Sequence, residues 1–232
     1  GAPLCEKYPI LAREVNTDQI KNITKVISKD QIMLIPISNS GYGIGEKGKF
    51  LDEKSQLNPI SLYGKSKVEA EKIAMENINT TSFRLATVFG CSDRMRVDLL
   101  VNDFVFKAFS LKKIVLFESH FRRNYVHILD VVRLFQFAIE NFKLFKGEIF
   151  NVGLSDANLT KMSLCKKIKE YVPELLILED EFKEDPDKRD YYVSNKKLEN
   201  TGFKMIKNLD QGIKELLTFF NMSKDVINFR NV

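Results

Sequence analysis

The sequence predicts an α/β fold with a doubly wound parallel sheet, because short apolar runs alternate along it with segments of helical character. The apolar runs have the length of buried strands. They cover residues 31–38, 82–89, 112–117 and 147–153. This order is typical of a parallel sheet, since parallel strands are joined by crossover connections that are usually helical.

The segments between these runs predict helices and one long loop. Apolar residues recur at helical spacing over 8–28, and strong helix formers fill 61–78. Residues 39–60 hold four glycines and a proline, so we expect a loop there. The predicted helices are 8–28, 61–78, 97–109 and 128–142. After residue 153 the elements become shorter and more charged, which indicates that residues 154–232 form a smaller lobe beside the sheet.

The composition argues against several classes of function. The chain carries 36 basic and 31 acidic side chains, and because the basic ones are spread along the sequence we expect no nucleic-acid partner. No apolar run approaches the roughly 20 residues that span a bilayer, so no membrane partner is expected. Three distant cysteines and two histidines predict neither a disulfide framework nor a metal site. The cytoplasm, a reducing compartment, is the expected location.

A candidate acid–base pair lies on the helix predicted over 61–78. Tyr63 and Lys67 are four residues apart, which places both side chains on one helix face. An ammonium there can stabilise a phenolate and lower a phenol pKa that is normally about 10. Tyr63 would then be a usable acid and base. The same spacing recurs at Tyr192 and Lys196 in the charged C-terminal segment, where Tyr192 is expected to pack at a strand edge.

A serine-rich loop follows the apolar run 31–38. Ligands of open α/β sheets bind at the carboxyl ends of strands, so the Ser40 hydroxyl is well placed to hold a reacting oxygen. An ordinary Ser/Gly turn is the alternative. The stretch from Gly43 to Gly48 matches the G-x-G-x-x-G pattern of dinucleotide sites. That fingerprint must open a helix, and because no helical periodicity follows, we reject it as a phosphate loop.

Three segments, in order along the chain, resemble the extended short-chain dehydrogenase/reductase family, above all its NAD-dependent nucleotide-sugar epimerases and dehydratases. NPISLYGKSKVEAE (58–71) resembles the family's active-site helix, SFRLATVFG (82–90) the following strand, and RRNYVHILDVVR (122–133) a segment with a substrate-binding arginine. UDP-glucose 4-epimerase-like enzymes share this order. The resemblance implies that residues 1–153 are the C-terminal part of a dinucleotide-binding Rossmann domain with interleaved substrate segments, and that residues 154–232 mainly bind substrate.

The resemblance also implies roles for individual residues. Ser40 would hydrogen-bond the sugar oxygen, Tyr63 would take a proton from a sugar hydroxyl, and Lys67 would hold the nicotinamide ribose. Further cofactor contacts are expected from Ser38, Thr87 and Val88, and further substrate contacts from Asn102, Arg123 and Arg189. A guanidinium fork suits diphosphate oxygens, and for both arginines an exposed ion pair is the alternative. His127 is expected to be a packed histidine.

The same resemblance implies the reaction and the assembly. The implied cofactor is NAD, with NADP as the alternative, and the implied substrate is a nucleotide-linked sugar. Gly41 and Tyr42 follow Ser40 where the family's dehydratases carry an acidic pair, which favours an epimerase that oxidises and re-reduces a sugar hydroxyl. A dehydratase or reductase of the same family and a non-catalytic nucleotide-binding relative are the alternatives. Helices 8–28 and 61–78 resemble those of the family's four-helix dimer interface, so a homodimer is expected.

The glycine-rich turn with which the family's cofactor domain begins is not in this sequence. We therefore expect a partial Rossmann fold that lacks its first strands, in an N-terminally truncated piece of a longer gene product. A protein that has lost tight cofactor binding is the alternative. A fragment without that turn need not be active by itself.

Overall fold

A three-stranded parallel sheet organises the first part of the fold, as the computed structural model shows for residues 1–46, 48–77, 79–180 and 189–222. Its strands lie in the order β1 (Met33–Ser38), β3 (Thr80–Leu85) and β7 (Ile149–Val152), all parallel. The central strand, β3, is buried over nearly its whole length. The predicted α/β class with a parallel sheet is confirmed.

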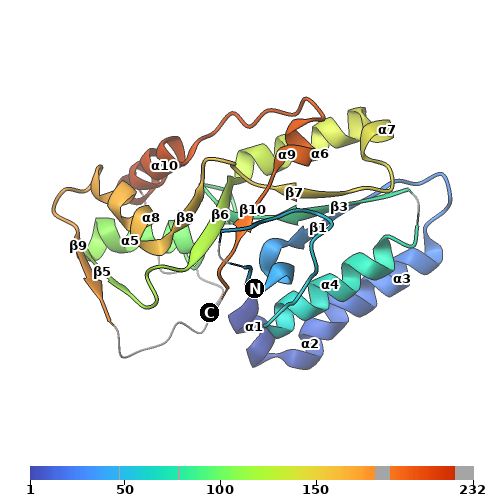
Figure 1. Cartoon of the computed structure of the whole chain (residues 1–232), viewed down its shortest axis with the longest axis horizontal. Coiled ribbons are helices and arrows are strands. Elements are labelled where there is room, and N and C mark those ends of the chain that lie inside the picture. Colours follow the sequence, from blue (N-terminus) through green and yellow to red (C-terminus); the bar gives the residue numbers. More distant parts are fainter. Residues whose placement is uncertain (47, 78, 181–188, 223–232) are drawn as a thin grey trace.

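Helices cover both faces of this sheet (Figure 1). One face carries α1 (Ala2–Lys7), α2 (Pro9–Arg13), α3 (Gln19–Val26) and α4 (Leu62–Ala74). The other carries α6 (Ile128–Glu140), α7 (Phe142–Phe145) and α9 (Lys196–Glu199). Ile35 and Ile37 of β1 pack on Ala70 and Ala74 of α4. On the opposite face Phe83, Phe150 and Leu134 belong to one buried cluster, so each face of the sheet has its own apolar layer.

The single helix predicted over 8–28 is wrong in its extent. Helical structure begins at Ala2, and α1 ends at Lys7 before Pro9 opens α2. Proline lacks the N–H that would continue the first helix, yet it fits the first turn of the next one. A π-helical turn, Glu14–Asp18, then joins α2 to α3.

The single strand predicted over 82–89 is also wrong, because the structure divides it at Ala86. Before Ala86 the chain runs in β3, and after it β4 (Thr87–Phe89) pairs with β6 (Arg122–His127) instead of β7. The Ala86 N–H still donates to the Val152 carbonyl at 2.8 Å, so the departure from the main sheet comes just after this bond. One apolar run of the sequence therefore contributes strands to two different sheets.

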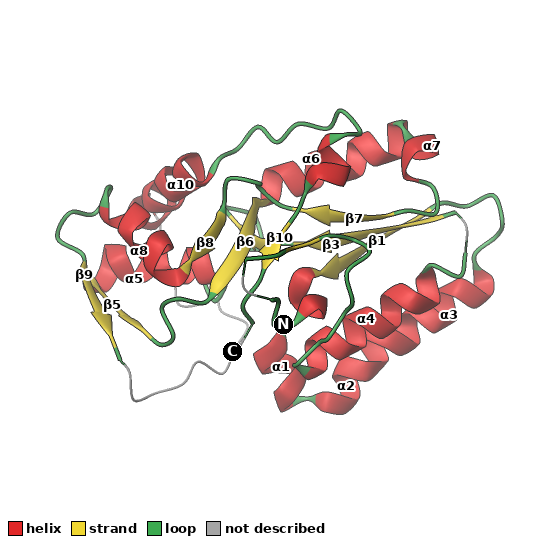
Figure 2. Ribbon diagram, in the orientation of Figure 1, coloured by secondary structure: helices red, strands yellow, loops and turns green. Residues whose placement is uncertain are grey.

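Most of the remaining elements form a lobe at one end of the main sheet (Figure 2). Its helices are α5 (Leu100–Leu111), α8 (Lys161–Lys169) and α10 (Leu209–Met222), and its strands are β4, β6 and β8 (Asn158–Thr160) with the ribbon of β5 (Lys113–Leu116) and β9 (Leu176–Glu179). The helix predicted over 97–109 thus begins at Leu100. Apolar side chains of α5, α8 and α10 share one buried cluster.

A short strand pairing joins two segments that lie far apart in the sequence. The segment predicted as loop over 39–60 contains the strand β2 (Phe50–Leu51), which pairs with β10 (Tyr192–Val193). The division of function at residue 153 stays a prediction. In the described part of the chain no helix is long and apolar enough to cross a bilayer, and no three His, Cys, Asp or Glu side chains gather as metal ligands.

Candidate functional site

The Ser40 turn lies at the carboxyl end of β1, as the sequence predicts. β1 ends at Ser38, whose hydroxyl accepts a hydrogen bond from the Ser40 N–H at 3.2 Å, and a 3-10 turn covers Asn39–Tyr42. The Ser40 hydroxyl is buried and has no hydrogen-bond partner among the described residues, and the same holds for both polar atoms of the Asn39 amide. Buried polar groups are nearly always satisfied, so two neighbouring residues without partners are a place where a ligand or water would bond.

Tyr63 and Lys67 lie on the first two turns of α4, which begins beside this serine turn. Ser61 caps the helix, its hydroxyl accepting from the Gly64 N–H at 3.1 Å. A Cβ atom at Gly64 would lie 3.1 Å from the Ser40 carbonyl oxygen. Glycine therefore lets the start of α4 approach the Ser40 turn closely, and the predicted catalytic residues are brought to the same end of the sheet.

The electrostatics of Tyr63 differ from the expectation drawn from spacing. Burial raises the pKa of Tyr63, while the Ser38 hydroxyl, which hydrogen-bonds the phenol, and the Arg189 guanidinium lower it, with Arg96 acting in the same direction. The net direction is upward. Burial also lowers the pKa of Lys67. The structure therefore places Ser38 and two arginines, rather than Lys67, foremost among the groups that favour the phenolate.

Arg96 is a site residue that the sequence analysis missed. It lies in the segment between β4 and α5, residues 90–99, which we call the site loop. Its Nε donates to Asp98 Oδ1 at 2.8 Å, and that pairing raises the pKa of Arg96. No motif surrounds this arginine, so only its charge could have drawn attention to it. In the structure it is close enough to Tyr63 to affect the pKa of the phenol.

Asn102, predicted to contact substrate, is buried and engaged with the site loop. Its Oδ1 accepts from the Gly90 N–H at 3.1 Å and its Nδ2 donates to the Arg96 carbonyl at 2.8 Å. Both the oxygen and the nitrogen of the Asn102 side-chain amide are thus hydrogen-bonded to backbone groups of the site loop. A substrate contact for Asn102 stays a prediction, and so do the cofactor contacts of Thr87 and Val88, which lie half-buried in β4.

The structure brings Arg123 and Arg189 together. Arg123 of β6 is buried, so the alternative of an exposed ion pair is wrong for it. Its guanidinium donates to the Arg122 carbonyl at 2.8 Å and to the Arg189 carbonyl, and it lies 5.9 Å from the centre of the Tyr191 ring. Since the charge of Arg189 also affects Tyr63, the two arginines and the phenol belong to one region.

A buried network of polar side chains holds Tyr42, the last residue of the Ser40 turn. The Arg84 guanidinium forms an ion pair with Glu71 of α4 at 2.6 Å and donates to the Tyr42 hydroxyl at 3.0 Å. That hydroxyl lies 2.7 Å from Asn151 Oδ1 on β7. Burial raises the pKa of Tyr42 to about 12, so the phenol stays protonated. Neither buried charge was singled out from the sequence.

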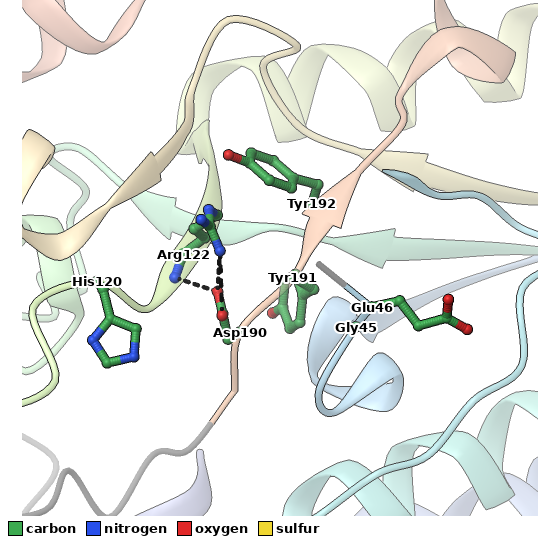
Figure 3. A pocket seen from close by; sticks show the side chains of 7 residues that line it. All are labelled: Gly45, Glu46, His120, Arg122, Asp190, Tyr191 and Tyr192. Carbon is green, nitrogen blue, oxygen red and sulfur yellow. Dashed lines mark hydrogen bonds and ion pairs between the residues drawn. The ribbon is translucent and has the colours of Figure 1, made fainter. Parts of the chain in front are cut away.

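A cavity of about 280 Å³ opens beside β10 (Figure 3). Its lining includes Gly45, from the rejected G-x-G-x-x-G stretch, and Tyr192, from the second Tyr-x-x-x-Lys match.

The structure also explains the two sequence matches beside this cavity. Gly43 has φ +70°, and a Cβ there would lie 2.0 Å from the Asn58 carbonyl oxygen, so this glycine serves a tight turn. The strand β2, and not a helix, follows Gly48, which confirms the rejection, and Tyr192 lies on a strand pair as predicted. Arg122 stacks on the Tyr192 ring at 4.7 Å and pairs with Asp190 at 3.3 Å.

Comparison with known proteins places this site in a family. The model of the NAD dependent epimerase/dehydratase family matches residues 2–153, well over half of the chain. The chain belongs to this family. The match spans Ser40, Tyr63 and Lys67, and it ends just after β7.

Individual proteins related to this epimerase/dehydratase chain are distant. The ADP-L-glycero-D-manno-heptose-6-epimerase of Brachyspira hyodysenteriae is 30% identical over 167 residues, covering 67% of the chain and 51% of that protein. The methionine adenosyltransferase 2 subunit beta of Bos taurus is 28% identical over 128 residues, covering 54% of the chain and 37% of that protein. The chain thus spans about half the length, or less, of these relatives.

Solved structures share the fold over nearly the whole epimerase/dehydratase chain. The UDP-glucose 4-epimerase of Thermus thermophilus in complex with NAD has a TM-score of 0.77 at 20% identity. The alignment covers 96% of this chain and 75% of that one. At this identity the comparison supports the fold and not the substrate.

Proposed function

We propose that the chain carries the acid–base and substrate-binding part of an NAD(P)-dependent nucleotide-sugar epimerase. The observation that carries this proposal is the buried Ser40 hydroxyl, which has no partner in the described residues and lies at the end of β1 beside the start of the Tyr63 helix. A serine turn that served only structure would satisfy its own hydroxyl. The family membership supplies the chemistry that such an arrangement serves.

Each residue has a distinct part in this proposal. The Ser40 hydroxyl donates to a sugar oxygen, and Tyr63 takes the proton of the sugar hydroxyl at its phenolic oxygen and later returns it. The Ser38 hydroxyl and the charges of Arg189 and Arg96 assist by favouring the phenolate. When bound, the nicotinamide dinucleotide supplies the hydride acceptor and donor. Lys67 would hold its ribose, with Ser38, Thr87 and Val88 at the nicotinamide.

Nucleotide-sugar recognition is proposed for the two arginines of the β6–β10 region. Arg123 is held by backbone carbonyls and the Tyr191 ring, which fixes the guanidinium in the interior of the lobe. A fixed guanidinium suits the oxygens of a diphosphate. NAD is the proposed cofactor, by analogy with the Thermus thermophilus enzyme and its bound NAD, with NADP as the alternative.

The test is interconversion of UDP-hexoses by the complete polypeptide that carries this chain, followed by chromatography of the nucleotide sugars. Formation of a C4 epimer without net consumption of NAD supports the proposal. A 4-keto-6-deoxy product would replace the epimerase by a dehydratase. Tight nucleotide binding without turnover would favour a non-catalytic relative.

We also propose a homodimer formed through the α1–α4 face, within a cytoplasmic protein whose three cysteines are free. Leu11 and Val15 are 54% and 53% exposed although both are apolar. Val26, at the end of α3, is 82% exposed. Apolar side chains gathered on neighbouring helices are typical of an interface, and a symmetric pair would bury them against each other.

Replacing both Leu11 and Val15 with Glu is expected to convert the dimer into a monomer. Charged side chains at the centre of an apolar interface lose their hydration on association, which opposes dimer formation. Sedimentation equilibrium would measure the mass. The matched control is Val132→Glu, which places the same charge on α6 at a side chain that is 50% exposed. A wild-type chain that is already monomeric contradicts the proposal.

A further inference from the structure

Helix α10 of the lobe contacts the site loop through the carboxylate of Glu215. Glu215 Oε1 accepts a hydrogen bond from the Cys91 N–H at 3.0 Å, across 124 positions of sequence. Its other oxygen, Oε2, lies 3.3 Å from Lys207 Nζ. Burial alone would raise the pKa of Glu215, but the Cys91 N–H, His127 and Lys207 outweigh it and leave that pKa lowered. The carboxylate is therefore ionised at neutral pH.

The ring of His127 is close both to this carboxylate and to the site loop. His127 caps α6, and its Nδ1 accepts from the Leu129 N–H at 3.2 Å, so the proton of the neutral ring is on Nε2. That nitrogen lies 3.3 Å from Glu215 Oε1, although not in hydrogen-bond geometry. Burial lowers the pKa of His127, and Lys207 acts with it, whereas Glu215 and Asp130 oppose it. A neutral, packed ring agrees with the prediction for this histidine.

Two glycines allow these elements to approach so closely. Gly90 has φ +106°, and a Cβ there would lie 2.4 Å from His127 Nε2. On α10, a Cβ at Gly212 would lie 2.2 Å from Cε2 of Phe89. Neither position has room for a side chain. The path of the chain at residues 89–91 is thus set between the His127 ring and α10.

Hydrogen bonds to Asn102 connect Gly90 and Arg96 of the site loop, and the charge of Arg96 acts on Tyr63. The side-chain amide of Asn102 is hydrogen-bonded to both the Gly90 N–H and the Arg96 carbonyl, so these two residues of the site loop are fixed relative to each other. Arg96 in turn is close enough to lower the pKa of the Tyr63 phenol. Contacts therefore run without a break from Glu215 through Cys91, Gly90 and Asn102 to the backbone of Arg96.

We propose that Glu215 is a positioning residue for the site: from α10 it fixes the site loop and so sets the position of Arg96. The catalytic meaning of this role rests on the proposed epimerase function. The structural part does not, because it concerns only how the loop is held. α10 is itself anchored, since the Asp130 carboxylate accepts from the Ile206 and Lys207 N–H groups at 3.0 Å each. The Glu215 carboxylate is therefore one of the links between the lobe and the site loop.

Amide exchange in the 232-residue chain tests how the loop is held. In Glu215→Ala the Cys91 N–H loses its acceptor, and its exchange, with that of Gly90, is expected to be about tenfold faster or more. Glu215→Gln keeps an oxygen at the same place and is expected to stay within about threefold of wild type, since a neutral acceptor still forms the bond. Lys207→Met is the control that removes the cation but leaves the acceptor. Unchanged exchange in Glu215→Ala, or equally fast exchange in both Glu215 variants, overturns the proposal.

Kinetics of the complete polypeptide test the consequence for the reaction. Glu215→Ala is expected to lower kcat about tenfold with KM for the nucleotide sugar nearly unchanged, and Glu215→Gln to restore most of it. Faster loop exchange without a change in kcat would overturn the positioning role. If the wild-type protein turns over no nucleotide sugar, the proposed function fails while the exchange experiment still decides whether Glu215 holds the loop.

Discussion

Replacing Tyr63 with Phe is expected to lower kcat for UDP-hexose epimerisation by about 100-fold or more. General acid–base catalysis by a positioned side chain contributes about 10²–10⁴-fold, and phenylalanine removes the proton-transferring oxygen while keeping the ring. Because Tyr63 does not hold the nucleotide in our proposal, KM should change little. The interconversion of UDP-glucose and UDP-galactose, followed by chromatography, measures the effect.

The pH profile provides a second readout of the same residue. The pKa of Tyr63 is raised by burial, so the phenolate is scarce near neutral pH. Turnover by the wild-type protein should therefore increase as pH rises, and Tyr63→Phe should remove that increase. Tyr192→Phe is the matched control, because Tyr192 has the same Tyr-x-x-x-Lys spacing but lies on β10. Wild-type turnover in Tyr63→Phe, or an equal loss in Tyr192→Phe, contradicts the assignment.

Replacing Glu71 with Ala is expected to lower the free energy of unfolding by about 3–5 kcal/mol, since removal of one partner leaves a buried charge uncompensated. The side chains of Arg84 and Glu71 are each only 5% exposed. The Glu71 carboxylate also accepts from the Ser82 hydroxyl at 2.6 Å, so a second buried group would lose its partner. Urea denaturation of the chain, followed by circular dichroism, measures the change.

Glu69 offers a control on the same helix. It pairs with Lys21 of α3 at 3.3 Å, but both side chains are substantially exposed. Exposed pairs contribute about 0–1 kcal/mol, so Glu69→Ala should have a small effect. A double variant, Glu71→Leu with Arg84→Met, should recover part of the lost stability because it leaves no buried charge. Equal losses in Glu69→Ala and Glu71→Ala would contradict this interpretation.

The main sheet was predictable because its strands are continuous apolar runs separated by helices, and β1 and β7 lie within predicted runs while most of β3 does. The division at Ala86 was not. Residues 82–89 form one uniform apolar run, and nothing local distinguishes the part that pairs with β7 from the part that pairs with β6. Pairing of β4 with β6 depends on partners more than 30 residues away, which periodicity does not report.

The candidate site was predictable where its residues lie in a motif. Ser40 and the Tyr63–Lys67 pair could be placed at one end of the sheet from spacing and strand order alone. Arg96 and Glu215 could not, because the first lies in a loop without a pattern and the second acts across 124 positions. Their roles depend on how α10 packs, and a single sequence does not contain that information.

One edge of the main sheet has a consequence for handling the chain in solution. Among the described residues β1 pairs only with β3, so its outer backbone groups face no other strand. An open edge of apolar sequence is a template for another extended chain, and Pro36 shortens it by removing one N–H donor. Concentrated samples should therefore self-associate slowly through added strands, which the onset of turbidity would measure.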